Sequence, residues 1–407
     1  MIIFFFHTLQ YKNKYINFLD TESRDEKALL NTAISVSILT LPLISHADSP
    51  YFSLKDGDGF KRFSVSVGAL HVMPQGKAQP ININTAVAEG EKSAVGSVTT
   101  KSVLNAIDTS TADGRTKHNK LEVLTNSGLT SPLIVDMING EKYLKPQVAG
   151  TATIDGLSQW KAQGTGLEAD DVTTLGIMTN YFFTDNISLE VKAGIPPKVD
   201  IQGKGQIHAP LRGIADPGSV NLIIADLDAG LVLDGDLPLK QDIFITDLSA
   251  HGKVAEARAW TPAFEFQYHF GKTGVNKFRP YVGLGMMYAY FNDLEMNPNL
   301  EADLVNAGHK IANIKNGAAG AALEGTVSTA NPKVKLEADD AIAPVATAGF
   351  TYDFNDRWFA VGSISYAHLT AEQTITVTDA SLGKLIEAKS DIEINPILGY
   401  AGVGYRF

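Results

Sequence analysis

The stretch that decides the fold is segment 399–407, which reads GYAGVGYRF. Apolar and aromatic residues alternate there with Gly404 and Arg406, which is the pattern of a β-strand with two unlike faces. In a soluble sheet such a strand would be an unpaired, aggregation-prone edge, whereas a closed β-barrel pairs its last strand with its first. The segment therefore favours an outer-membrane β-barrel, and a strand of an ordinary soluble sheet is the competing interpretation.

The composition agrees with a barrel. Of the 407 residues, 44% are hydrophobic and 19% are charged, while the mean hydropathy is near zero, so the apolar residues are spread out along the chain. The chain has no cysteine, so an exported form must be stabilised by backbone pairing and packing. A net charge of −11 argues against nucleic-acid binding, which requires a basic surface.

An export signal precedes the strands. Lys27 is followed by the apolar run 28–44 and by Ser45-His46-Ala47, a small-x-small cleavage site of a secretory signal peptide. A transmembrane helix is the alternative, but the strictly apolar part is shorter than the roughly 20 residues that span a bilayer. We expect 1–47 to be an N-terminal extension and signal peptide, with the true translation start after Met1, and 48–407 to be the barrel.

Eight segments after Ala47 alternate as transmembrane β-strands do. In 187–193 the odd-numbered positions are apolar, and the even-numbered positions carry Ser188, Glu190 and Lys192. The expected strands are 63–72, 172–183, 186–195, 263–270, 278–291, 344–354, 357–370 and 391–407.

The connections alternate between short and long. Tight turns are expected at 184–185, 271–277 and 355–356, and extracellular loops at 75–171, 196–260, 292–343 and 371–390. A bacterial barrel with both ends in the periplasm requires this alternation, whereas a soluble sandwich does not. The sequence thus predicts an all-β fold, an eight-stranded antiparallel transmembrane β-barrel of the bacterial outer membrane, with long extracellular loops and short periplasmic turns.

Aromatic residues beside the short turns are expected to form a girdle at the periplasmic interface. The expected girdle consists of Tyr181, Phe182, Phe183, Tyr268, Phe270, Phe278, Tyr352, Phe354, Trp358, Tyr405 and Phe407.

Three hairpins carry a family resemblance. They contain YFFTDNISLE at 181–190, YHFG at 268–271 leading to KFRPYVGLG at 277–285, and AGVGYRF at 401–407; NDRW at 355–358 and Pro74 add to it. These strands and turns resemble the OmpW family. The resemblance implies a small eight-stranded outer-membrane barrel with a narrow, largely apolar interior. It also implies passage of small hydrophobic compounds, a part in stress responses and, in places, phage or bacteriocin reception.

The chain departs from that family inside the barrel. Members are described with bulky apolar side chains that constrict the lumen on the third and seventh strands, where this chain has Lys192 and Ser365. The C-terminal strand, in contrast, resembles the signal read by the barrel-assembly machinery. The residues that carry this signal are Tyr400, Gly402, Tyr405 and Phe407.

Alternation places a set of polar residues in the lumen. The candidate lumen-lining residues are Lys192, Glu190, Ser365, Glu265, Gln267 and Asp353. A lysine inside a narrow barrel needs water or a partner, and Glu190, Glu265 or Asp353 would supply the charge. Two interpretations stay open: a packed ion-pair network that plugs the barrel, or a polar-tuned conduit.

The long loops are less informative. Loop 75–171 is rich in Thr, Ser, Ala, Gly and Asn, and is expected to bury little apolar surface alone, with 132–137 forming a short strand or helix over the barrel mouth. Segment 220–236 is expected to extend the barrel strands or to form a cap. Its acidic residues, Asp226, Asp228, Asp234 and Asp236, invite a calcium interpretation, but their spacing fits no known calcium loop, and solvated charge is commoner.

Catalysis is not expected. His208, His251, His269 and His368 are separated and lie in no nucleophile or metal-binding motif. We therefore expect no enzyme activity, no cofactor and no metal.

The leading hypothesis is passive passage of small, mainly hydrophobic molecules. The alternative is a non-conducting surface barrel whose loops act in adhesion, in phage or bacteriocin reception, or in structural stabilisation. Expected partners are outer-membrane lipid and lipopolysaccharide, the barrel-assembly machinery and small hydrophobic solutes, with no nucleic acid. The oligomeric state stays open.

Overall fold

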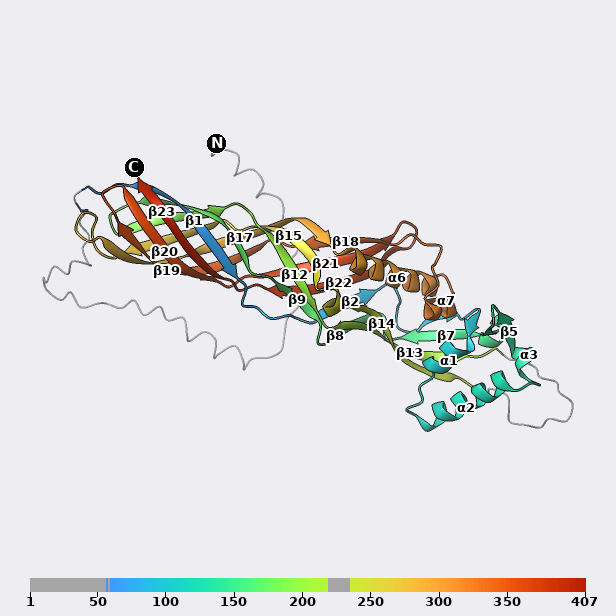
Figure 1. Ribbon diagram of the computed structural model, residues 1–407. Helices are drawn as coiled ribbons and strands as arrows, with labels where there is room; N and C mark the ends of the chain where they lie inside the picture. Colours follow the sequence, from blue (N-terminus) through green and yellow to red (C-terminus); the bar gives the residue numbers. More distant parts are fainter. Residues whose placement is uncertain (1–55, 58, 219–234) are drawn as a thin grey trace, which may run out of the picture. The chain divides into compact units, whose positions relative to one another are not determined.

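The computed structural model describes residues 56–57, 59–218 and 235–407 (Figure 1). The expected signal peptide at 1–47 and the acidic residues Asp226, Asp228 and Asp234 lie outside the described residues. Within the described ranges, no helix is long and apolar enough to cross a membrane.

Eight antiparallel strands close into a barrel (Figure 1). In order around the wall they are β1 (Phe63–Met73), β10 (Val172–Phe182), β11 (Ile187–Gly194), β16 (Ala263–His269), β17 (Phe278–Met296), β19 (Ala341–Asp353), β20 (Trp358–Ala367) and β23 (Ile397–Arg406). The wall closes between β23 and β1, from Ser64 opposite Arg406 to Met73 opposite Ile397. The predicted barrel is confirmed.

The expected strands match the observed ones except at a few ends, of which the last strand is the clearest. It was expected from position 391 but begins at Ile397. Pro396 has no N–H to donate to the ladder, and Asn395 has φ +40°, which breaks the extended conformation. Residues before this break belong instead to β22 (Gly383–Glu393), a strand outside the barrel.

The barrel wall has an apolar outside and a polar inside. On β16 and β17, Phe266 and Leu284 point outward and are 63% and 70% exposed, whereas Glu265 between the outward residues of β16 is fully buried. Most of the expected girdle residues also face outward. Phe182 is an exception: it is buried inside the barrel, with its ring centroid 4.9 Å from that of His269. Its placement in the girdle was wrong, because alternation between exposed Tyr181 and Phe183 turns it inward.

The barrel wall continues beyond the long-loop end as an extension. Its strands are β9 (Gly166–Ala169), β12 (Lys198–Lys204) and β15 (Lys253–Trp260), which join the end of the long strand β17. The expected loops therefore contain ordered strands.

The remaining long-loop residues form a folded cap of three small sheets and seven helices within the described residues. The four-stranded sheet contains β14 (Leu237–Asp247), β13 (Gln206–Asp216), β7 (Thr151–Asp155) and β3 (Glu91–Ala94). The five-stranded sheet contains β18 (Lys333–Ala338), β21 (Thr370–Asp379), β22, β2 (Ile81–Thr85) and β8 (Gln159–Ala162). The three-stranded sheet contains β4 (Val98–Thr99), β6 (Glu141–Leu144) and β5 (Val135–Ile138). The helices are α1 (Thr100–Ala106), α2 (Ala112–Asn126), α3 (Ser131–Ile134), α4 (Pro146–Ala149), α5 (Leu248–His251), α6 (Pro298–Lys315) and α7 (Ala319–Glu324).

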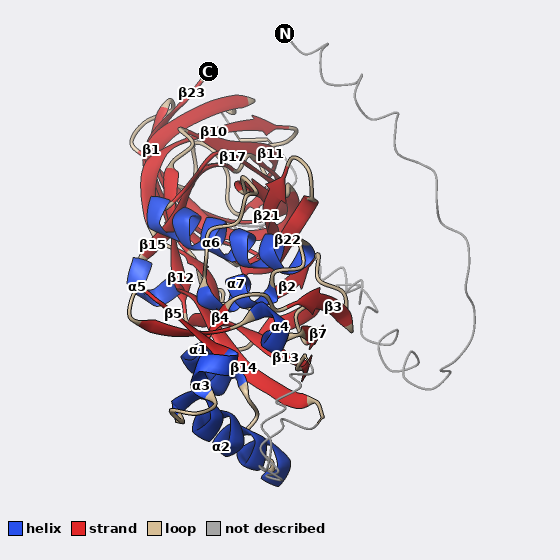
Figure 2. Cartoon of the chain, turned by 90° about the vertical axis from the view of Figure 1, so that its right-hand side faces the viewer, coloured by secondary structure: helices blue, strands red, loops and turns tan. Residues whose placement is uncertain are grey.

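Helix α6 packs against β14, β18, β21 and β22, and Figure 2 shows it lying beside β21 and β22. Its start is specified locally: the Asn297 side chain accepts a hydrogen bond from the backbone N–H of Asn299, and Pro298 occupies the first turn. Glu301 in the first turn and Lys315 in the last turn match the helix dipole.

Loop 75–171, which was expected to bury little apolar surface alone, buries it in a core shared with the other loops. Its Val98 and Leu121 are 0% and 1% exposed, within one apolar core that also contains Leu385 of β22. The composition argument considered the loop alone, but its strand β2 pairs with β22, from a different loop. The short strand or helix expected at 132–137 is present as α3 and β5.

Candidate functional site

A buried polar layer crosses the barrel at Lys192. The Lys192 Nζ atom is 2.6 Å from Glu265 Oε1 and 3.6 Å from Glu190 Oε1. It also donates hydrogen bonds to Thr347 Oγ1 at 2.8 Å and to Ser365 Oγ at 2.9 Å. The lysine therefore connects two carboxylates on one side of the barrel with two hydroxyls on the other.

Strand register explains why these residues meet. Glu190 of β11 lies directly opposite Glu265 of β16, and Thr347 of β19 lies opposite Ser365 of β20. Directly opposed residues share one face of a sheet, so each pair points into the barrel together. Gly283 completes the fit, because a Cβ atom there would lie 2.9 Å from Glu265 Oε2. We call these five side chains, Lys192, Glu190, Glu265, Thr347 and Ser365, the lysine layer.

Asp353 does not belong to the lysine layer, although it was one of three expected candidates, with Glu190 and Glu265, for the partner of Lys192. It accepts a hydrogen bond from Arg406 Nη2 at 2.8 Å, near the short-turn end of the barrel. The reason is position along the strand: Asp353 is the last residue of β19, whereas Thr347, six positions earlier, contacts Lys192. Arg406 lies on the inner face of β23, with 3% of the residue exposed.

The short-turn half of the interior is filled. Arg279 Nη1 is 3.0 Å from Asp185 Oδ1, and both side chains are almost fully buried. Gln267 Oε1 lies 3.1 Å from His269 Nε2, and the Tyr281 ring stacks on that histidine at a centroid distance of 4.8 Å. Arg279 and Asp185 were missed from the sequence, although the inward position of Arg279 on β17 was available from alternation.

The long-loop half of the interior contains a chamber of about 240 Å³. The lysine layer supplies part of its lining, and apolar side chains supply most of the rest. The lining includes Leu70, Val72, Met178, Ile195, Pro197, Trp260, Met287, Val345 and Leu398, together with Lys192, Glu265 and Ser365. A smaller cavity of about 90 Å³ shares Val72, Pro197, Ala259, Thr261, Met287 and Leu398 with it and lies toward the extension.

The barrel wall beside this chamber is interrupted. Pairing between β11 and β16 ends at Lys192 opposite Ala263, and pairing between β12 and β15 begins only at Lys198 opposite Arg258. Between them we find one bridging backbone hydrogen bond, from Ala259 N to Pro197 O at 3.0 Å. Three prolines, at 196, 197 and 262, occur in this stretch and have no N–H to donate. We call residues 193–197 and 259–262 the wall gap.

The expected assembly residues divide between the two faces of β23. Tyr400 is buried, and its hydroxyl hydrogen-bonds Ser66 Oγ at 3.0 Å; Gly402 packs against that tyrosine. Tyr405 and Phe407 lie on the outer face, with ring centroids 5.0 Å apart. Their role in assembly stays a prediction.

Within the described residues, no group of three or more metal-binding side chains is arranged to hold an ion.

A closed antiparallel barrel with an apolar outside and a charged inside defines an outer-membrane β-barrel protein. Comparison with known proteins shows which family the chain resembles. The model of the OmpW family matches residues 237–322. Outer membrane protein W of Vibrio cholerae serotype O1 is 26% identical over 282 residues, which cover 69% of this chain and 95% of that protein. These matches make the chain similar to the OmpW family, and the protein lies in the bacterial outer membrane.

Solved outer-membrane proteins are also similar. OprG from Pseudomonas aeruginosa is 15% identical, with a TM-score of 0.42 and coverage of 85% of this chain and 96% of OprG. The outer membrane protein AlkL, determined in DMPC bilayers, is 13% identical, with a TM-score of 0.35 and coverage of 90% and 97%.

Proposed function

We propose that this protein provides passive passage for small, mainly hydrophobic molecules, which enter from the long-loop end and leave sideways through the wall gap. The observation that carries this proposal is the chamber of about 240 Å³, with the lysine layer in its lining and the wall gap at its side. An apolar cavity of about 150 Å³ is large enough to hold benzene, so the chamber has room for solutes of that class.

Energetics favour the sideways exit. To reach the periplasm, a solute would have to displace Lys192 from Glu265 and then separate Arg279 from Asp185. Breaking a buried ion pair costs about 3–5 kcal/mol. To leave through the wall gap, it has to open the hydrogen bond between Ala259 and Pro197, which is worth about 0.5–1.5 kcal/mol. The lysine layer then closes the periplasmic side of the chamber. In this way the plug and conduit interpretations are both retained: the ion-pair network blocks the periplasmic half, and the chamber above it conducts.

The first test fills the chamber. Val345→Trp places a large side chain in the lining, and Val282→Trp, 49% exposed on the lipid side, is the matched control. Entry of naphthalene is measured in vesicles with lipopolysaccharide in the outer leaflet. We expect Val345→Trp to lower the protein-dependent rate at least tenfold and Val282→Trp to leave it unchanged. Equal rates in a folded Val345→Trp barrel would refute passage through the chamber.

The second test locks the wall gap. Pro197→Cys with Ala259→Cys puts two thiols beside the bridging hydrogen bond, on residues that both line the chamber. The chain has no other cysteine. Hydrogen-bonded neighbours are about 5.5 Å apart at Cα, within disulfide range. Oxidation is expected to stop entry and reduction to restore it. Entry that continues after oxidation, with ion conductance in planar bilayers, would place the exit in the periplasm instead.

A surface-binding function is the second candidate, favoured by one patch of the cap. Helices α2 and α3, the loop between them and strand β5 expose the apolar residues Val123, Leu129, Leu133, Met137 and Ile138. Exposed apolar patches are typical of binding surfaces. Leu129→Ser with Met137→Ser is expected to abolish phage or cell adhesion without changing naphthalene entry, if this candidate is correct.

We also propose that the protein is not an enzyme and binds no nucleic acid. In the cap, Thr246 Oγ1 and Asp303 Oδ2 both contact the same His251 atom, Nε2, at 3.0 Å and 3.1 Å. A catalytic triad needs the carboxylate on the opposite ring nitrogen, so that the histidine can accept the hydroxyl proton. Lipid, lipopolysaccharide and the barrel-assembly machinery remain the proposed partners.

A further inference from the structure

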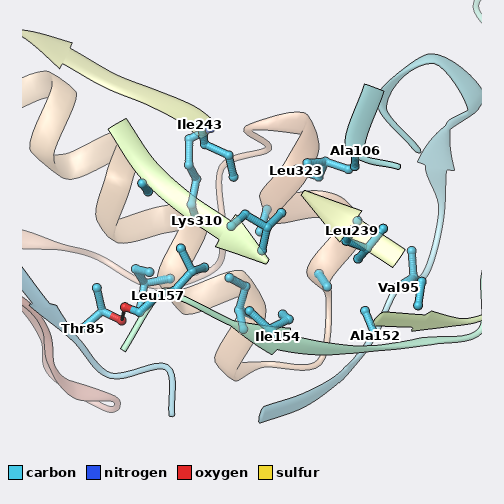
Figure 3. A pocket seen from close by; sticks show the side chains of 18 of the residues that line it. Thr85, Val95, Ala106, Ala152, Ile154, Leu157, Leu239, Ile243, Lys310 and Leu323 are labelled. Carbon is cyan, nitrogen blue, oxygen red and sulfur yellow. Dashed lines mark hydrogen bonds between the residues drawn. The ribbon is translucent and has the colours of Figure 1, made fainter. Parts of the chain in front are cut away.

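The cap contains a hollow of its own, separate from the chamber in the barrel. This cavity has a volume of about 140 Å³ and lies in the apolar core between sheets and helices (Figure 3). Its walls come from loops that are distant in sequence: Ile154 on β7, Ile243 on β14 and Leu323 on α7 are examples. It shares no described lining residue with the barrel chamber.

A cavity of this size is unusual for a folded core. Protein interiors pack like organic crystals and contain few voids larger than a water molecule. A water molecule is a poor occupant, because it needs two to four polar partners. A cavity of about 150 Å³ with aliphatic walls stays dry and binds benzene. The size and the apolar lining therefore select one guest of about the volume of a single aromatic ring.

The lining also indicates the charge of the guest. Apart from the indole of Trp160, the polar side chains among the described lining residues are Thr85 and Lys310. The Thr85 hydroxyl is already engaged, because it donates to the Leu157 carbonyl at 2.8 Å. A carboxylate guest would find no free hydrogen-bond donor from Thr85.

Lys310 lines the cavity with the methylene groups of its side chain and not with its charged amine. The Nζ atom lies beside Gly325, where a Cβ atom would be 3.5 Å away, at the C-terminal end of α7. This is where a helix dipole favours a cation. Burial lowers the pKa of Lys310, which agrees with an amine held close to the protein interior.

We propose that this cavity is a binding site for one small neutral hydrocarbon of about single-ring size, held in the cap independently of passage through the barrel. Affinity comes from apolar contact with the walls, and charged analogues are disfavoured because the indole N–H of Trp160 is the one buried side-chain donor without a partner among the described lining residues. The proposal does not rest on the proposed function, since binding is measured without transport.

The test uses benzene and benzoate as a matched neutral and anionic pair. The chain has three tryptophans, and Trp160 is the one that lines the cap cavity. With Trp260→Phe and Trp358→Phe, fluorescence of the folded full chain in lipid nanodiscs reports on Trp160 alone. We expect a saturable change with benzene, together with a higher unfolding temperature of the cap, and no saturable change with benzoate.

Two alanines provide the filling variant and its control. Ala152 on β7 lines the cavity, whereas Ala94, on the neighbouring strand β3, is exposed. Ala152→Leu is expected to weaken benzene binding at least tenfold, and Ala94→Leu is expected to leave it unchanged. A linear, non-saturating response in the parent chain, or equal binding by folded Ala152→Leu, would overturn the proposal.

A second pair of variants keeps the test decisive if Ala152→Leu does not fold. Ala307→Val fills the cavity from α6, and Leu323→Ala enlarges it from α7. The first is expected to weaken benzene binding, and the second to shift preference toward naphthalene by at least tenfold. Unchanged binding in both variants would overturn the proposal. Naphthalene entry through the barrel is measured alongside: loss of binding in the cap with normal entry separates this site from the passage.

Discussion

The barrel and the cap have opposite interiors, although both are closed by β-structure. Inside the barrel, Arg279 and Glu265 are buried with their partners, while Leu284 on the outside is 70% exposed. Inside the cap, Leu121 and Leu385 are buried in an apolar core. Lipid surrounds the barrel and water surrounds the cap, so apolar side chains point outward in one and inward in the other. The surrounding solvent decides which face of a strand becomes the core.

The largest effect is expected from breaking a charge pair inside the barrel. Arg279→Met leaves Asp185 buried without its cation, and the free energy of unfolding should fall by about 3–5 kcal/mol. Thermal unfolding followed by heat-modifiable gel mobility measures it. Lys198→Met is the control, because Lys198 pairs with Glu256 at the solvent-exposed surface, where water screens the pair and its loss should change stability little.

The double variant Arg279→Met with Asp185→Asn sharpens this result. It should recover part of the loss, because no unpaired charge remains in the interior. If the single and double variants lose equal stability, packing of the arginine stem matters more than charge.

An intermediate effect on the free energy of unfolding is expected from truncating a leucine in the cap core and a leucine on the outer barrel face. Leu385→Ala in the cap core should cost about 2–5 kcal/mol, the range for a buried leucine. Leu284→Ala on the outer barrel face, which packs against detergent in the assay, should cost less than 1.5 kcal/mol, roughly one buried methylene or two. Chemical unfolding is followed by tryptophan fluorescence, in which Trp160 reports on the cap and Trp358 reports on the barrel. Equal losses would contradict the inversion of the two interiors.

The smallest effect concerns acid. Hydrogen bonds from Ser381, Asn331 and Leu382 hold the pKa of Asp379 well below its ordinary value of 3.8 in the turn between β21 and β22. The ionised side chain therefore stabilises the cap above pH 3.8, and this contribution is lost as the pH falls through the folded-state pKa. Asp379→Asn should flatten the acid side of the cap's stability profile, measured by Trp160 fluorescence. A profile identical to that of the parent chain would exclude this role.

Alternation and turn spacing were enough to predict the barrel from the sequence. They also placed Lys192 and Ser365 inward, and the structure brings the two together at 2.9 Å. Periodicity fixes which face a residue occupies, since side chains alternate strictly along a strand. Periodicity does not fix the position of a residue along the barrel axis, because that position depends on how neighbouring strands are staggered. For this reason Asp353, one of the three candidate partners of Lys192, pairs instead with Arg406.

The cap could not be predicted because its order comes from pairing between loops. Asn82 of the first loop lies opposite Lys389 of the fourth, and Arg212 of the second loop lies opposite Asp155 of the first. Each loop read alone has too few apolar residues for a core. Only when the barrel brings the loop ends together do their scattered residues, such as Val98 and Leu385, become neighbours in one core.

The wall gap also fixes the depth of the protein in its bilayer. Backbone groups that lack strand partners cannot face hydrocarbon, so residues 193–197 and 259–262 must lie at or above the level where acyl chains give way to sugar. Trp260, within the gap and opposite Tyr290, is 44% exposed, as expected of a ring at that boundary. The prolines thus mark the upper boundary of the hydrocarbon layer on the barrel wall. A solute that leaves there enters the outer leaflet at its upper edge.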